Sequence, residues 1–87
     1  MDQEKLVKMA NEIAAFFAAE PDREVALEGI AGHIKRFWEP RMRRAIFAAL
    51  DAGGEGMQPH VKEALAAHRK MLEPAAAPRG SGSPTDS

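Results

Sequence analysis

Four prolines, Pro21, Pro40, Pro59 and Pro74, divide the chain into short stretches. Proline lacks a backbone N–H and clashes inside a helix, so each is expected to end one helix or to begin the next. Between the prolines, apolar residues recur at intervals of three and four, which is the spacing of one helix face. No stretch alternates at period 2. The sequence therefore predicts an all-α fold, a small bundle of three to four short helices.

The predicted helical domain spans residues 1–73 and contains helices near residues 3–19, 22–38, 40–52 and 59–72. The first two helices carry matching apolar stripes and are joined by a short turn. They are therefore expected to pack as an antiparallel hairpin. The stripes are Leu6, Met9, Ala10, Ile13, Phe16 and Phe17 in the first helix and Leu27, Ile30, Ala31, Ile34, Phe37 and Trp38 in the second. Gly29 and Gly32 either allow another helix to approach closely or form a kink.

The third and fourth predicted helices have shorter stripes. These are Met42, Ala45, Ile46, Ala49 and Leu50 in the third and Val61, Ala64, Leu65, His68 and Leu72 in the fourth. Phe47 lies off the third stripe, so it either packs at a second face or is exposed to a partner. Gly53 and Gly54 provide a helix end with positive φ available. Gln58 is a weak N-cap for the fourth helix.

Composition limits the classes of protein that the chain can belong to. Residues 74–87 are mostly Pro, Gly, Ala and Ser, which predicts a disordered C-terminal tail. The remaining helices form a small core that rarely supplies more than about 3–5 kcal/mol. No apolar run approaches the roughly 20 residues of a membrane span, and the charged start is unlike a signal peptide. We therefore expect no membrane partner, and possible self-association of the isolated chain.

The residues that usually carry catalysis or bind metals are scarce. The chain has no cysteine and no tyrosine, and every serine and threonine falls within residues 74–87. His33, His60 and His68 lack the i, i+4 pairing of a metal-binding helix. The carboxylates near Glu24 belong to a first helical turn, where the helix dipole and water stabilise them. We therefore expect no catalytic residues, no metal site and no bound cofactor.

The stretch HIKRFWEPRMRR, residues 33–44, is the most distinctive part of the sequence. It contains the single tryptophan and five of the twelve Lys and Arg residues, and Pro40 predicts a sharp corner between two helices. Tryptophan and arginine are enriched where proteins bind one another. The predicted partner-binding residues are Phe37, Trp38, Arg41, Arg44 and Phe47.

Two other interpretations of this corner remain open. One is a solvated basic face over a local core. The other is a helix-turn-helix-like nucleic-acid-binding protein that uses residues 35–44. A Trp-Glu-Pro turn followed by a largely apolar helix is unusual for a helix-turn-helix protein. The net charge of −1 also gives little support to nucleic-acid binding. We therefore expect no nucleic-acid partner.

Three segments between Lys5 and Leu65 resemble the delta subunit of soluble, NAD-dependent, molybdenum-containing formate dehydrogenases. The segments are KLVKMANEIAAFFAAEPD, GIAGHIKRFWEPRMRRAIFAALDAGGEG and PHVKEAL, and FWEPRMR is the most specific part. Glu39 stands where Asp is more usual in that family, and Met57-Gln58 where Leu-Ser is more usual. Both differences weaken a helix N-cap.

The resemblance implies a non-catalytic accessory subunit of a cytoplasmic complex. Such a subunit docks on the large catalytic (alpha) subunit and stabilises the complex or assists its assembly. The alpha subunit would carry bis-molybdopterin guanine dinucleotide and iron–sulfur clusters, and further subunits would handle FMN and NAD. The lack of cysteine agrees with a chain that holds no cluster itself.

Overall fold

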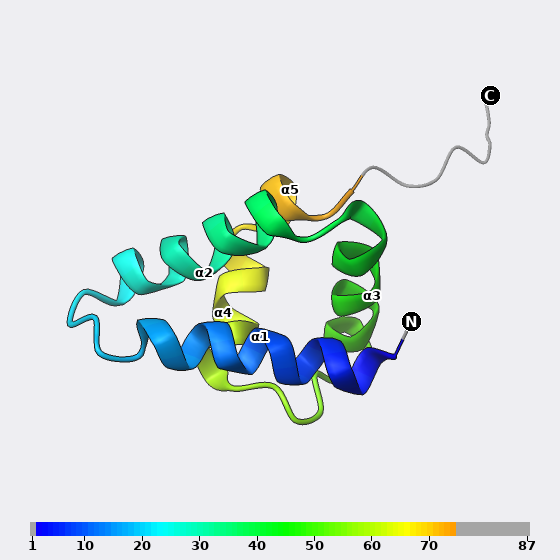
Figure 1. Ribbon diagram of the computed structural model, residues 1–87, viewed down its shortest axis with the longest axis horizontal. Coiled ribbons are helices and arrows are strands. Elements are labelled where there is room, and N and C mark those ends of the chain that lie inside the picture. The colour runs from blue at the N-terminus through cyan, green and yellow to red at the C-terminus, as the bar shows by residue number, and fades with distance from the viewer. Residues whose placement is uncertain (1, 75–87) are drawn as a thin grey trace.

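The computed structural model describes residues 2–74, and these residues form helices without a strand. The helices are α1 (Gln3–Phe17), α2 (Arg23–Phe37), α3 (Pro40–Asp51), α4 (Pro59–Ala67) and the single turn α5 (Arg69–Leu72) (Figure 1). The expected all-α bundle is confirmed. Apart from Pro74, the predicted disordered tail lies outside the described residues.

The helices begin where short polar side chains or prolines allow. Asp2 accepts a hydrogen bond from the backbone N–H of Glu4 at 3.0 Å, and Asp22 caps α2 in the same way. Each carboxylate thereby satisfies a backbone donor that has no partner inside the helix. Pro40 and Pro59 occupy the starts of α3 and α4, and the residues before them make no side-chain cap bond.

Two glycines end α3, as the sequence predicts. Gly53 and Gly54 have φ angles of 123° and 66°, a region that side chains disfavour. The backbone N–H of Gly54 donates to the carbonyl of Ala49 at 2.9 Å. This bond satisfies a carbonyl near the end of α3 and turns the chain toward α4.

α1 and α2 form the expected antiparallel hairpin (Figure 1). The ring of Phe17 occupies the space where a side chain on Gly29 would lie, so a Cβ there would come within 2.7 Å of the ring. Gly29 therefore permits the close approach of α1. α2 continues as a single helix through both glycines.

The buried face of α1 differs from the predicted stripe. Leu6, Val7, Ala10 and Ala14 are the buried residues of α1, whereas Met9 and Phe16 of the predicted stripe are exposed. The reason is that α1 contacts α3 and α4 as well as α2. These neighbours bury the Val7 side of the helix and leave the Met9 side open.

The fourth predicted helix is divided at His68. His68 leaves helical geometry with φ −115° and ψ 26°, and α5 begins at the next residue. The turn allows Leu72 to reach the core, where it is fully buried. The carbonyl of Leu72 accepts a hydrogen bond from Nη1 of Arg43 at 2.9 Å, which ties α5 to α3.

Phe47 is buried, with 1% of its surface exposed, so it packs at a second face of α3. The guanidinium of Arg69 lies over its ring, 4.9 Å from the ring centre. Arg69 also donates two hydrogen bonds to Asp51, at 2.9 and 2.7 Å, and two to Glu73. We call these four residues the α3–α5 seam.

Candidate docking surface

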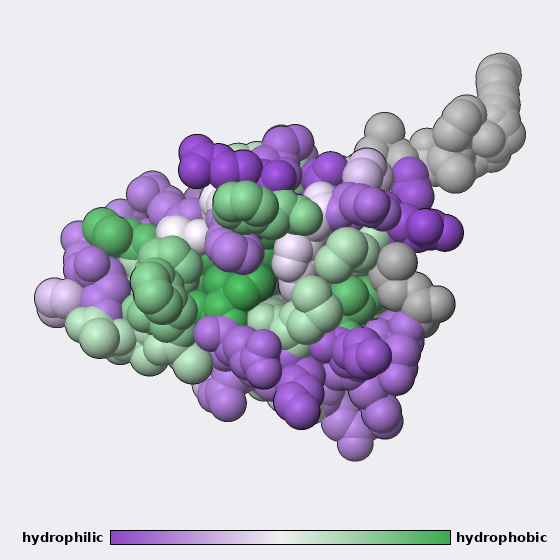
Figure 2. Space-filling model, viewed as in Figure 1, coloured by the Kyte–Doolittle hydropathy of each residue, from purple (hydrophilic) through white to green (hydrophobic). Residues whose placement is uncertain are grey.

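An apolar groove lies on the outer side of the helical hairpin. It encloses about 370 Å³ and is lined by Met9, Glu12, Ile13, Phe16, His33 and Trp38. We call it the α1–α2 groove. Figure 2 shows an apolar band over the face that α1 and α2 share, with hydrophilic residues on either side of it.

Two aromatic rings are largely uncovered, one that lines the groove and one that lies next to its lining residue His33. Phe16 is 80% exposed and packs edge-to-face on Phe17, with ring centres 5.1 Å apart. Phe37 is 65% exposed and lies beside the ring of His33, 4.8 Å between centres. Large apolar side chains gathered in one exposed area are typical of a surface that contacts another molecule.

Cationic residues precede and follow Phe37 in the sequence, at the corner between α2 and α3. The exposed cationic residues of this basic corner are Lys35, Arg36, Arg41 and Arg44. Within residues 2–74, none of the four forms an ion pair. Arg43 belongs to the interior instead, because it bonds the carbonyl of Leu72 and its Nε atom is buried.

The five predicted partner-binding residues do not share one surface. Phe37, Arg41 and Arg44 are exposed and accessible to a partner. Trp38 is only 5% exposed, and Phe47 is buried under Arg69. Neither ring is therefore accessible in the isolated chain, and Phe47 takes the packed position of the two that the sequence left open. Both belong to the core cluster, because the two helices that meet at the corner turn them inward.

Sequence reasoning missed three residues of the groove, Met9, Ile13 and Phe16. It assigned them to the core because their spacing is that of a buried helix face. The missed signal was the breadth of the apolar arc on α1, which also includes Val7 and Ala14. An arc wider than one packing face leaves apolar side chains uncovered at one of its edges.

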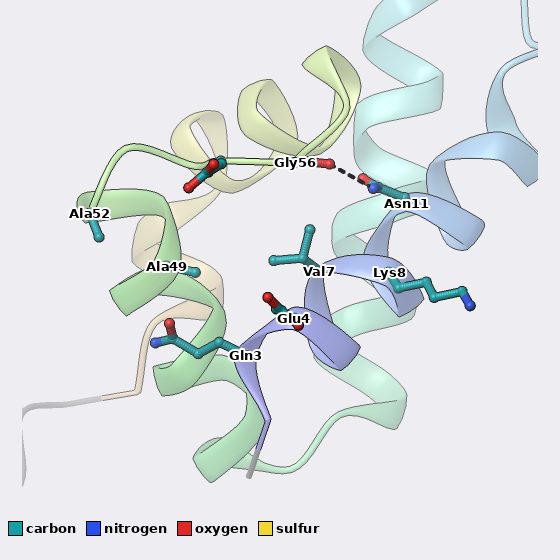
Figure 3. A pocket seen from close by; sticks show the side chains of 9 residues that line it. Gln3, Glu4, Val7, Lys8, Asn11, Ala49, Ala52 and Gly56 are labelled. Atoms are coloured by element: carbon teal, nitrogen blue, oxygen red, sulfur yellow. Dashed lines mark hydrogen bonds between the residues drawn. The ribbon is translucent and has the colours of Figure 1, made fainter.

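A second cleft of about 510 Å³ lies between α1, the end of α3 and the following loop (Figure 3). Its lining includes Asn11, which donates to the carbonyl of Gly56 and accepts from the N–H of Gln58, both at 2.9 Å. These bonds hold the loop against α1. The charged residues of the cleft, Glu4, Lys8 and Glu55, are exposed. The cleft therefore brings no buried reactive groups together.

Metal ligands are not clustered in residues 2–74, where no three His, Asp or Glu side chains could share an ion. Thiolate ligation of an iron–sulfur cluster is excluded by the sequence, which has no cysteine. None of the helices among these residues has the length and apolar character needed to cross a membrane.

Fold and surface together define a small helical protein whose distinctive feature is an apolar groove beside a basic corner, an arrangement typical of a protein-binding surface. The chain matches the family of NADH-dependent formate dehydrogenase delta subunits (FdsD) over residues 5–65. It belongs to that family. Neither a curated protein nor a solved structure matches it.

Proposed function

We propose that the chain is a non-catalytic accessory subunit of a cytoplasmic formate dehydrogenase complex that reduces NAD⁺. It docks on the large catalytic subunit and stabilises the assembled complex. Membership of the delta-subunit family supports the association with formate dehydrogenase. The observation that carries the docking role is the pair of exposed rings, Phe16 and Phe37, together with the basic corner next to Phe37, whose cationic residues form no ion pair within residues 2–74.

A structural role suits the chemistry of the chain better than a catalytic one. Serine and threonine occur only beyond residue 74, and the sequence has no cysteine or tyrosine. The molybdenum centre, the iron–sulfur clusters and FMN would therefore be held by partner subunits. The contribution of this chain is stability, because a subunit that binds only the folded partner shifts the partner's unfolding equilibrium toward the folded state.

Co-expression of a tagged large subunit with and without this chain tests the proposal. We expect the chain to be retained on the large subunit through purification. We also expect formate-dependent NADH formation, followed by absorbance, to decay faster on heating when the chain is missing. A chain that washes off at low salt, and whose omission changes neither yield nor heat resistance, would overturn the proposal.

The exposed part of the basic corner is the first contact to test. We propose that Phe37, Arg41 and Arg44 touch the large subunit, while Trp38 and Phe47 support them from the core. The double variant Arg41→Glu and Arg44→Glu should fold normally, because changes at exposed positions usually lie within about 0.5 kcal/mol. Its retention by the large subunit should fall, most strongly at low salt. Unchanged retention would remove the two arginines from the interface.

A further inference from the structure

We propose that the α1–α2 groove receives an amphipathic helix of the large subunit. The apolar face of that helix lies on Met9, Ile13 and Phe16, and its carboxylates lie at the end beside the basic corner. This inference rests on the proposed function, which it deepens by naming the secondary structure and charge order of the partner segment.

The shape of the groove favours a helix. Its walls are two antiparallel helices of 15 residues each. Met9, Ile13 and Phe16 follow one another at i, i+4 and i+7, so they span about 10 Å along α1 at 1.5 Å per residue. An amphipathic helix that lies in such a groove presents its own apolar residues with the same spacing, over about two turns. A chain segment with isolated apolar residues would leave part of this row uncovered.

The charges at the two ends of the hairpin differ in sign. Phe37 lies at the end where Arg36 and Arg41 are exposed. The opposite end is the turn between α1 and α2, where Glu20, Asp22 and Glu24 follow one another within five residues. A complementary helix therefore carries carboxylates near Phe37 and cationic residues near the turn. This order fixes the direction in which the helix lies.

The chain's own residues 75–87 do not supply such a helix. They contain no aromatic residue and no Leu, Ile, Val or Met that could cover exposed Phe16 and Phe37. The competing occupant is a second copy of the chain, which would place the basic corner of one copy against the acidic turn of the other. The experiment is therefore designed to separate a large-subunit helix from a second copy.

A photo-crosslinking amino acid at position 16 or 37 tests the occupant in the assembled complex. We expect both positions to crosslink to a single helical segment of the large subunit, with acidic residues in the part that position 37 reaches. The same amino acid in place of Met71, which is 42% exposed on α5, is the matched control and should give no such product. Crosslinks mainly to a second copy, or to a non-helical or basic segment, would overturn the inference.

Substitutions measure the contribution of the groove. The double variant Phe16→Ser and Phe37→Ser should raise the Kd for the large subunit at least tenfold, while Met71→Ser leaves it unchanged. Both rings are exposed, so the variant should keep the helical circular dichroism spectrum of the wild type. The charge variant Arg36→Glu and Arg41→Glu should also weaken binding, and the exposed control Lys70→Glu should not.

The two proposals fail in different ways. If the wild-type chain binds the large subunit and the double phenylalanine variant binds equally well, the groove is not the site and the accessory role stands. If the wild-type chain does not bind at all, the proposed function fails, and this inference fails with it.

Discussion

The α3–α5 seam and the α1–α2 groove differ in the exposure of their aromatic residues. At the seam, Phe47 is 1% exposed and Arg69 covers its ring while bonding Asp51 and Glu73. At the groove, Phe16 and Phe37 have no such cover within residues 2–74. The cationic residues of the basic corner form no ion pair with described residues. In the seam, by contrast, Arg69 forms ion pairs with both Asp51 and Glu73.

This difference indicates which side of the protein buries its aromatic surface without a partner. A ring covered by a paired guanidinium contributes to the stability of the isolated chain. An exposed ring contributes little to that stability, because its surface remains in water. Such a ring contributes favourable free energy only when a partner covers it and removes its surface from water. We therefore expect the seam to contribute to folding and the groove to contribute to association.

The largest expected effect comes from comparing the two rings directly. Phe47→Ala should lower the free energy of unfolding by about 3–5 kcal/mol, the usual result of removing a buried ring. That loss is comparable to the whole stability expected of so small a core. Phe16→Ala should change it by less than about 0.5 kcal/mol. Urea unfolding followed by circular dichroism measures both. Equal losses for the two variants would contradict the comparison.

The next largest changes in stability are expected from substitutions of the two glycines of α2, and the two changes should have opposite signs. Gly29→Ala should destabilise the chain by about 1–3 kcal/mol, because the new methyl group meets the ring of Phe17. Gly32→Ala should stabilise it by up to about 1 kcal/mol, because no atom beyond its chain neighbours and the backbone of its own helix lies within 4 Å of the added carbon, and alanine favours a helix. Melting temperatures of the two variants provide the measurement. A stabilising Gly29→Ala would mean that α1 and α2 do not approach closely there.

Acid should weaken the seam by a smaller amount. Hydrogen bonds from Arg69 hold the pKa values of Asp51 and Glu73 below their ordinary values, and the same carboxylates raise the pKa of Arg69. Because the folded carboxyl pKa values are depressed, their contribution to stability is present at neutral pH. It is lost as the pH falls from about 4, the ordinary pKa of a carboxyl group, through the lower pKa values that these groups have in the folded state.

The variant Arg69→Gln isolates this contribution. It removes the cation, so the part of the acid-induced loss of stability that depends on the seam should disappear. Urea midpoints measured between pH 7 and pH 3 for wild type and variant make the comparison, with Arg36→Gln as a control from the groove side. Parallel pH profiles for wild type and Arg69→Gln would show that the seam does not respond to acid.

The smallest expected effect is on nucleic-acid binding. Arg43 is bonded to Leu72, which leaves Arg41 and Arg44 as the exposed cations of α3. With Lys35 and Arg36 they make four exposed cations at the basic corner, and phosphate binding by so few charges is suppressed by salt. We expect no shift of duplex DNA in a gel at physiological salt. A sequence-dependent shift lost in the Arg41→Glu and Arg44→Glu variant would reassign the corner to nucleic acid.

Much of the local structure was predictable because its signals lie close together in the sequence. Asp22, Pro40 and Pro59 mark helix starts, and Gly53 and Gly54 mark an end, since each acts on backbone groups within a few residues. The approximate helix bounds and the weak caps at Glu39 and Gln58 follow from the same local chemistry. The break at His68 was not predicted, because it depends on burial of Leu72 by residues distant in sequence.

The candidate surface was only partly predictable. The basic corner was recognised, and Phe37, Arg41 and Arg44 are exposed there. Trp38 and Phe47 are buried, because whether a ring faces outward depends on which neighbours cover it. Composition identifies residue types that suit an interface, but those same types also suit a core.

The sequence by itself determined an all-α chain, its helix starts, the antiparallel hairpin and the position of the basic corner. Each follows from periodicity, from proline or from charge along the chain. Only the tertiary structure decided which side of α1 is buried. Its apolar arc is wider than one contact face, and packing against α3 and α4 selected the Val7 side. That selection placed Met9 and Phe16 in the open groove, which is where we expect the partner to bind.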